Sequence, residues 1–227
     1  LAEKESYLLR AVDADPESAP ARGDLCAFYF ETGQLDQFYR QAEKLESLAS
    51  DFGNIGYLQA LVPLKQKRFS EAANNLEAYL ATERGHREAE EVFLYALAAA
   101  DRLDDAVDQW NRLHEMEQHR LEEPAAAMII GPGEGISVSG GRVTLGRVEA
   151  VQILTSALGN PPVPPAVFAF RVDYITADIL RQAGNPDKAV LYYRRALVAL
   201  RPEALPESDR RLHEEAARRS AEYYAEQ

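Results

Sequence analysis

The sequence is poor in cysteine and has no long apolar stretch. One cysteine, Cys26, stands among 227 residues, so no disulfide can form within the chain. A single thiol suits a reducing compartment, which favours the cytoplasm over the periplasm. No apolar run approaches the roughly 20 residues that a membrane-spanning helix needs. The start, Leu1–Glu5, has neither an initiator methionine nor a signal-peptide pattern, so we expect no membrane insertion and a piece of a longer protein.

Basic charge is also in short supply. The chain has 25 Lys and Arg against 37 Asp and Glu, a formal net charge of -12. Nucleic acids and anionic membranes attract proteins through clustered Lys and Arg. The densest basic pairs are interleaved with Glu and Ala; they are Arg194-Arg195, Arg210-Arg211 and Arg218-Arg219. DNA, RNA and anionic membranes are therefore not expected as partners.

A short phrase recurs along the chain. Its copies are Gly33–Phe38, Lys67–Ala72, Asp101–Ala106 and Gly184–Ala189. The first three start at a constant interval (67−33 = 34 and 101−67 = 34), and the fourth starts after a longer one (184−101 = 83). Apolar residues on either side of each phrase recur at steps of three and four, which places them on one face of a helix. Each phrase is therefore expected to join two amphipathic helices into an antiparallel hairpin.

This period of 34, with two helices in each period, resembles the tetratricopeptide repeat family. The family has a small residue in the first helix, matched by Cys26, Ala60 and Ala177, with Leu94 in the remaining copy. A small residue in the second helix is matched by Ala72, Ala106 and Ala189, with Phe38 departing. A bulky residue four positions later is matched by Leu76, Trp110 and Tyr193, with Ala42 departing. The pair that closes a repeat in the family appears at Asp15-Pro16.

The resemblance implies an all-α fold, a tetratricopeptide-like α-α superhelix (solenoid) with a small β-hairpin insertion. Counted back from Asp15-Pro16, residues 1–14 resemble the second helix of a repeat whose first helix is missing. The expected division is repeats at 1–118 with the first one truncated, an irregular insertion with a Pro-rich connector at 119–165, a last hairpin at 166–202 and a C-terminal capping helix at 203–227.

The insertion breaks the period and carries a strand signal. Pro124 fits the first turn of a short helix through 125–130, which Gly131–Gly135 would end. Residues 136–145 alternate apolar and polar on both sides of Gly140-Gly141, which predicts a β-hairpin. Helix is expected again over Arg147–Leu158, followed by a stiff extended connector. The expected apolar face of that helix is Val148, Val151, Leu154 and Leu158, and the connector is Asn160–Pro165.

The hairpin needs a partner, because two strands alone are marginally stable in water. Val138, Val143 and Leu145 can be covered by neighbouring helices of the chain or by a strand from a second protein. The apolar residues nearby favour the chain's own helices, with one edge of the hairpin left free for a partner. The last helix is expected over about 208–226, with Ser208 as its N-cap and with Leu212, Ala216 and Tyr223 on the side that covers the last repeat.

Patterns that could carry chemistry favour structural interpretations. His114 and His119 are five residues apart, which turns the second about 140° from the first on a helix, whereas zinc helices space two histidines by four. A solvated helix end is expected there instead. In Gly131–Gly135 the proline lacks an N–H and Glu134 is negative, which disfavours phosphate. Ser137 and Ser139 lack the Gly-x-Ser-x-Gly pattern and the strand–turn–helix context of a catalytic serine. We therefore expect no enzyme, no metal and no cofactor.

The resemblance implies a binding surface. In the family, the first helix of each repeat lines a concave face that binds other proteins. By register this face would include Phe30, Tyr57, Leu61, Lys65, Tyr95, Tyr174, Asp178 and Arg181. Each is either a binding anchor or part of the packing between repeats, since buried Tyr is common in both settings. Gly23 and Ala27 stand where some members hold a peptide carboxylate, so that activity is not expected.

The expected function is a non-catalytic scaffold that binds a segment of another protein or peptide on this face. The alternative is a structural subunit, or an envelope or secretion-assembly component, that its repeats hold in a larger complex. The oligomeric state stays open.

Overall fold

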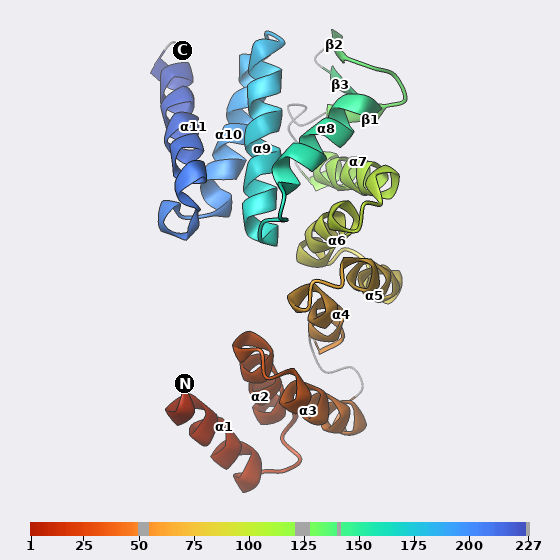
Figure 1. Cartoon of the computed structure of the whole chain (residues 1–227), viewed down its shortest axis with the longest axis vertical. Coiled ribbons are helices and arrows are strands. Elements are labelled where there is room, and N and C mark those ends of the chain that lie inside the picture. The colour runs from red at the N-terminus through yellow and green to blue at the C-terminus, as the bar shows by residue number, and fades with distance from the viewer. Residues whose placement is uncertain (50–54, 121–127, 140–141, 226–227) are drawn as a thin grey trace. The chain divides into compact units, whose positions relative to one another are not determined.

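The computed structural model describes residues 1–49, 55–120, 128–139 and 142–225, with the side chains of 115–120, 138 and 142 outside the description. The chain separates into two units, Leu1–Ala89 and Glu90–Gln227. The described residues form eleven α-helices, one 3-10 helix and one three-stranded sheet (Figure 1). This confirms the expected fold class of helical hairpins with a small β insertion. The finer division into four segments stays a prediction.

The first unit consists of helices that follow one another with short turns. They are α1 (Ala2–Ala14), α2 (Ala19–Thr32), α3 (Leu35–Leu48), α4 (Ile55–Lys65) and α5 (Phe69–Thr82). The closest packing joins α2 to α3 and α4 to α5, and α2 also contacts α4. The core of this unit includes Leu25, Phe28 and Leu45, each at most 2% exposed. The two predicted hairpins of this unit are therefore present, and α1 packs beside α2. That α1 is the second helix of a truncated repeat stays a prediction.

The recurring phrase has one backbone geometry in all four copies. Its first residue adopts a left-handed conformation, with φ between 58° and 76°, at Gly33, Lys67, Asp101 and Gly184. The next residue donates its N–H to the carbonyl five residues earlier, as Gln34 does to Tyr29 at 2.9 Å and Arg102 does to Leu97 at 2.9 Å. This pattern closes a helix and reverses the chain. Every copy therefore ends one helix and starts its antiparallel partner.

The positions singled out by the family resemblance lie in the core. The small first-helix residues Cys26 and Ala177 are 0% exposed, as are Ala72 and Ala106 in the second helices. In the first hairpin Phe38 replaces the small residue and Ala42 replaces the bulky one, and both are 0% exposed. These two residues are one helical turn apart, so the exchange keeps the volume of the core nearly constant.

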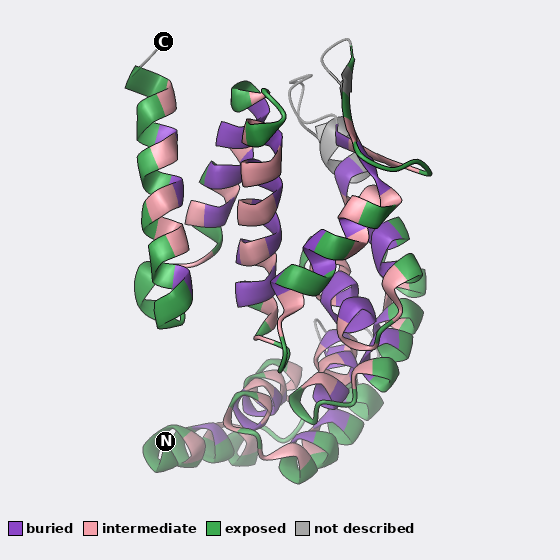
Figure 2. Ribbon diagram, turned by 45° about the horizontal axis from the view of Figure 1, so that its top comes forward, coloured by how far each residue is buried: buried purple, intermediate pink, exposed green. Residues whose placement is uncertain are grey.

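The second unit continues the hairpins and holds the insertion. Its elements are α6 (Arg87–Ala99, which starts in the first unit), α7 (Leu103–Arg120), β1 (Met128–Gly131), β2 (Ile136–Ser139), β3 (Arg142–Gly146), α8 (Arg147–Leu158), α9 (Pro165–Gln182), α10 (Pro186–Ala199), the 3-10 helix η2 (Pro202–Ala204) and α11 (Glu207–Ala225). Helix α6 is buried without interruption over Phe93–Ala98 (Figure 2). Gln109 of α7 donates to the Glu90 carbonyl at 3.2 Å and so ties α7 to α6. Six consecutive buried residues leave this part of α6 without a solvent-facing side, as in a helix enclosed by its neighbours.

The insertion contains a strand that we predicted as helix. The expected helix through 125–130 is wrong over 128–130, which belong to β1, while Pro124 and residues 121–127 lie outside the described residues. The sheet order is β1-β3-β2, with β1 parallel and β2 antiparallel to β3. A third strand satisfies backbone groups that a lone hairpin would leave open. The predicted hairpin is confirmed.

The sheet packs on the chain's own helices. Met128, Val143 and Leu145 are at most 2% exposed; β1 contacts α7 and α8, and β3 contacts α8. The carbonyls of Gly133 and Gly135 accept the N–H groups of Arg147 and Gly146, at 3.0 and 2.8 Å. A Cβ on Gly146 would lie 2.7 Å from the Gly133 oxygen, so this contact needs glycine. Packing on neighbouring helices, the favoured expectation for the hairpin, is therefore confirmed.

Of two local expectations around α8, one is partly right and one is wrong. Leu154 is buried as expected, but Val148 is 44% exposed, and the other buried residues of the helix are Ala150, Ile153 and Ala157. The segment after α8 is not an extended connector but a turn over 159–162, with a cis bond at Asn160-Pro161. The N–H of Val163 donates back to the Leu158 carbonyl at 3.0 Å and closes this turn.

Helix α11 covers the last hairpin, as expected. Leu212 packs on a cluster that includes Val167, Phe170 and Ala196, and the Tyr223 hydroxyl donates to Asp187 of α10 at 2.9 Å. Ser208 is not the N-cap. The helix starts at Glu207, and the Ser208 hydroxyl donates to Asp209 at 3.1 Å.

A buried ion pair fixes α11 to α9. Arg171 donates through Nε and Nη2 to the two carboxylate oxygens of Asp209, at 2.7 and 2.8 Å. The side chain of Asp209 is 1% exposed and that of Arg171 is 19% exposed. The hydrogen bonds from Arg171 hold the pKa of Asp209 below its ordinary value. Removing the partner of a charge buried this deeply would leave it uncompensated and would strongly destabilise the fold.

We expect Arg171→Met to lower the free energy of unfolding by about 3 kcal/mol or more, because it leaves the Asp209 carboxylate buried without its cation. Urea unfolding monitored by circular dichroism measures this loss. The control is Arg218→Met, which removes two exposed ion pairs within α11 and should leave the unfolding midpoint nearly unchanged. Equal effects of the two substitutions would contradict the assignment.

The same pair predicts a dependence on pH. The pKa of Asp209 is lower in the folded chain than in the unfolded chain, so the stabilisation is complete above the unfolded pKa of about 3.9 and is lost as the pH falls towards the folded value. In Arg171→Met this part of the acid sensitivity should disappear.

Candidate functional site

Three predicted binding residues meet on the first helices of the first unit. The Nζ of Lys65, on α4, lies 4.5 Å from the ring centroid of Phe30, on α2. Leu61 is one turn before Lys65 on the same helix, so the two side chains share a face. Phe30 and Leu61 are half-buried and Lys65 is exposed. We call these three residues the first-helix patch. It combines accessible apolar surface with a positive charge.

Tyr57, also on α4, lies in the packing. It is 4% exposed, and its ring centroid is 5.8 Å from that of Tyr79 and 4.8 Å from that of His86. Tyr79 and His86 are themselves joined, with 3.1 Å between the hydroxyl oxygen and Nδ1. The ring of Tyr57 therefore holds α4 against the segment that follows α5. Its part in binding a partner stays a prediction.

The predicted aromatic residues of the second unit are also enclosed. Tyr95 is 4% exposed, its ring centroid lies 5.5 Å from that of Phe168, and burial raises the pKa of its hydroxyl. Tyr174 is half-buried, stacks on Phe170 at 6.4 Å and packs in the cluster that Leu212 of α11 joins. The chain's own capping helix thus covers part of the first-helix surface here.

Asp178 and Arg181 form a network on α9. Asp178 accepts hydrogen bonds from Arg181 at 2.9 Å, Gln182 at 2.6 Å and the Tyr193 hydroxyl at 3.2 Å. Burial favours protonation of Asp178, but these hydrogen bonds outweigh it and hold the pKa below its ordinary value. Burial raises the pKa of Tyr193 to about 12. The charges of Asp178 and Arg181 therefore largely offset each other, although both side chains are about one-third exposed, at 32% and 35%.

The histidine motif does not have the setting that we predicted. His114 is 2% exposed rather than solvated. Its Nδ1 lies 2.9 Å from the Trp110 carbonyl oxygen, to which it must donate, and its Nε2 lies 2.7 Å from the Tyr192 hydroxyl. Both nitrogens are thus engaged by protein groups and are not turned to a metal. The side chain of His119 lies outside the described residues, and no group of metal-binding side chains gathers in the part that is described.

Two other motifs have structural roles. The Gly131–Gly135 loop offers carbonyls to the start of α8, whereas a phosphate needs N–H donors. Cys26 is 0% exposed and burial raises the pKa of its thiol to about 11, so the nucleophilic thiolate is scarce at neutral pH.

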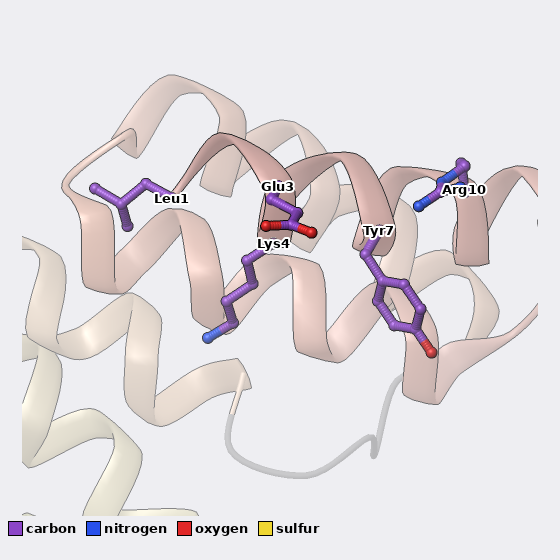
Figure 3. Close-up of a pocket in the computed structure, with 5 residues that line it drawn as sticks. All are labelled: Leu1, Glu3, Lys4, Tyr7 and Arg10. Atoms are coloured by element: carbon purple, nitrogen blue, oxygen red, sulfur yellow. The ribbon is translucent and has the colours of Figure 1, made fainter.

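A surface pocket on α1 is lined by one helix alone. Its residues are Leu1, Glu3, Lys4, Tyr7 and Arg10 (Figure 3). A small-molecule site encloses most of its ligand, which one helix cannot do. Leu1 and Tyr7 are 89% and 68% exposed, and we did not predict this apolar face. The sequence did contain a signal for this apolar face. Leu1 stands one repeat period before Leu35 (35−1 = 34), and Leu35 is half-buried. In the described residues, no helix is both long and apolar enough to cross a membrane.

We expect Tyr95→Ala to lower the free energy of unfolding by about 3 kcal/mol, because it empties a buried aromatic site beside Phe168. Tyr95→Phe should retain most of the stability. The matched control is Tyr7→Ala, at an exposed position, which should change little. Chemical denaturation measures all three, and a Tyr95→Ala protein as stable as the parent would refute the packing role.

We expect the purified protein to hold no stoichiometric zinc, since the ring nitrogens of His114 already have hydrogen-bond partners. Elemental analysis after dialysis against dilute zinc tests this. One zinc per chain that disappears in His119→Ala would overturn it.

Comparison with known proteins bears on the fold. No protein-family model matches the chain, and no curated protein matches its sequence significantly. Among solved structures, the crystal structure of yeast Tom70 is similar with a TM-score of 0.50 and 13% sequence identity, over 97% of this chain and 43% of that chain. The chain thus spans less than half the length of that relative. Likeness at this identity shows the fold alone, which is a helical-repeat fold of the tetratricopeptide type.

Proposed function

We propose that this chain is a tetratricopeptide-family scaffold without catalytic activity, which binds a segment of another protein on the first helices of its repeats. The observation that carries the proposal is the first-helix patch. Two consecutive first helices, α2 and α4, bring Phe30 and Lys65 together at 4.5 Å with the amine exposed. Aromatic residues, Phe among them, are enriched at protein interfaces.

The patch specifies the chemistry of its partner. Covering the half-buried Phe30 and Leu61 removes apolar area from water, which favours an apolar side chain in the partner. Lys65 is placed to meet a carboxylate at the rim of that contact, where charge improves specificity and the rate of association. A partner segment that carries an acidic residue next to a large apolar residue fits both requirements.

The fold and the side chains support a binding role over catalysis. The likeness to the Tom70 structure agrees with a helical-repeat scaffold. His114 is buried with both ring nitrogens within hydrogen-bond distance of protein groups, and Cys26 is buried, so neither side chain is placed to carry chemistry. The alternative stays a structural subunit, or an envelope or secretion-assembly component, that its repeats hold in a larger complex.

The test is site-specific photo-crosslinking in a lysate of the source organism. A benzophenone amino acid replaces Leu61 in one protein and Glu43, which is exposed on α3, in the control. We expect one protein to be captured from position 61 and not from position 43. Lys65→Glu should abolish that capture and Lys44→Glu, the same charge change on α3, should preserve it. Equal capture from both positions, or no effect of Lys65→Glu, would refute the first-helix patch as the binding site.

A further inference from the structure

Helix α4 has no continuous polar side. Its sequence is IGYLQALVPLK, in which only Gln59 and Lys65 have long polar side chains. A helix that is apolar all round is normally buried on every side. The side of α4 that carries Ala60 and Pro63 follows this rule and is buried. Three leucines of the helix are only half-buried and keep apolar surface in contact with solvent; they are Leu58, Leu61 and Leu64.

Part of this apolar surface continues the first-helix patch along α4. Leu58, Leu61 and Lys65 recur at steps of three and four residues, which places their side chains in one row. The row is about 10 Å long, because a helix rises about 1.5 Å per residue. Phe30 of α2 widens it, since its ring centroid lies 4.5 Å from the Lys65 amine. We call these three residues of α4 together with Phe30 the α4 stripe. Phe30 and Leu58 also pack on the buried core of the unit, which holds the stripe in place.

A helical partner and an extended partner have different requirements at such a surface. When a segment is covered, its backbone N–H and C=O groups lose water, and each group then needs another hydrogen-bond partner. A helix supplies these partners within itself, except at its ends. An extended segment depends instead on polar groups of the surface that covers it. The polar groups of the α4 stripe therefore decide which conformation it can bind.

The side chains of the stripe contain no hydrogen-bond acceptor. Three of them have no polar atom; they are Phe30, Leu58 and Leu61. The amine of Lys65 donates hydrogen bonds but cannot accept them. Gln59, which has an amide, and Pro63, which interrupts the helical hydrogen bonds, both lie about 160° round the helix from Leu61. The Glu31 carboxylate, next to Phe30 in sequence, lies 3.7 Å from a lysine amine of α1. The stripe itself therefore cannot satisfy the N–H groups of an extended segment.

We propose that the partner segment at the first-helix patch is an amphipathic α-helix rather than an extended peptide. This inference rests on the proposed function and adds the conformation of the partner to it. Apolar side chains of the partner, at steps of three and four residues, cover Phe30, Leu58 and Leu61. An acidic residue at the edge of that apolar face meets the exposed amine of Lys65. The backbone groups of the partner stay bonded to one another, so the contact leaves none of them unsatisfied.

The test compares two fluorescent peptides of about 15 residues, a length at which an isolated helix is marginal in water. Both carry leucines at steps of three and four residues, one glutamate beside them and a lactam bridge between two polar side chains. The second peptide differs only in two central polar residues, which are D-amino acids and disfavour a right-handed helix. We expect the first to bind at least about tenfold more tightly by fluorescence anisotropy, because the second leaves buried backbone groups unsatisfied.

Charge reversal shows whether the helical peptide lies on the stripe. Lys65→Glu should weaken its binding at least about tenfold, because the glutamate of the peptide then meets a like charge. The same variant should bind a version of the peptide that has lysine in place of glutamate. Lys44→Glu, the matched change on α3, should alter neither result. Backbone carbon chemical shifts of the isotope-labelled peptide, measured by NMR, should report helix in the bound state.

The outcomes separate this inference from the proposed function. Equal binding of the two peptides, weakened for both by Lys65→Glu, would retain the patch as a binding site and refute the helical partner. Absence of binding at millimolar helical peptide would also refute it, while photo-crosslinking from position 61 decides the proposed function. Binding of the helical peptide that Lys65→Glu leaves unchanged would place it elsewhere and contradict the inference. Crosslinking of position 61 to a second copy of this chain would contradict it as well.

Discussion

A left-handed residue at the end of each first helix is the constraint on which the repeats depend. Gly33, Lys67, Asp101 and Gly184 all adopt it, and all are followed by the same hydrogen bond back into the helix. Two of the four are not glycine, and a side chain in this conformation costs about 1 kcal/mol. The packing of the hairpins offsets that cost, because a turn of any other shape would direct the second helix away from the first.

Given this turn, the core constrains the total volume of its side chains more than the residue type at each position. Phe38 and Ala42 show this, because the first hairpin exchanges large and small between two positions that face the same neighbour. Leu94 shows it as well, since it is 6% exposed where the other repeats have a small residue. Degenerate matches to a repeat pattern are what such a core permits, and they are consistent with a shared fold at 13% identity.

The difference between contacts that are close in sequence and contacts that are distant explains which features the sequence could predict. Hairpins depend on residues close in sequence, so the regular period and the turn phrase located α2 to α7, α9 and α10 well. The failures involve distant partners. A short apolar run such as Met128–Ile130 fits helix or strand equally, and its pairing with β3 decided the outcome. The sequence around His114 predicted a solvated helix end, but Tyr192, which is far along the chain, packs against this histidine. Tyr57 and Tyr95 were assigned by register, which gives the helix face but not the depth of the side chain.

Helix and sheet offer a partner different groups. In the helical hairpins, each N–H and C=O beyond the ends is used inside its own helix, so the first-helix patch can recognise a partner by side chains alone. Strand β2 is hydrogen-bonded within the sheet on one side only, by β3, so half of its backbone groups lie outside the ladder. Recognition through side chains depends on the partner's sequence, whereas recognition through the backbone depends mainly on its extended conformation. The insertion therefore differs from a helical repeat in its backbone, because one side of β2 lies outside the hydrogen bonding of the sheet, at the place where the regular period is interrupted.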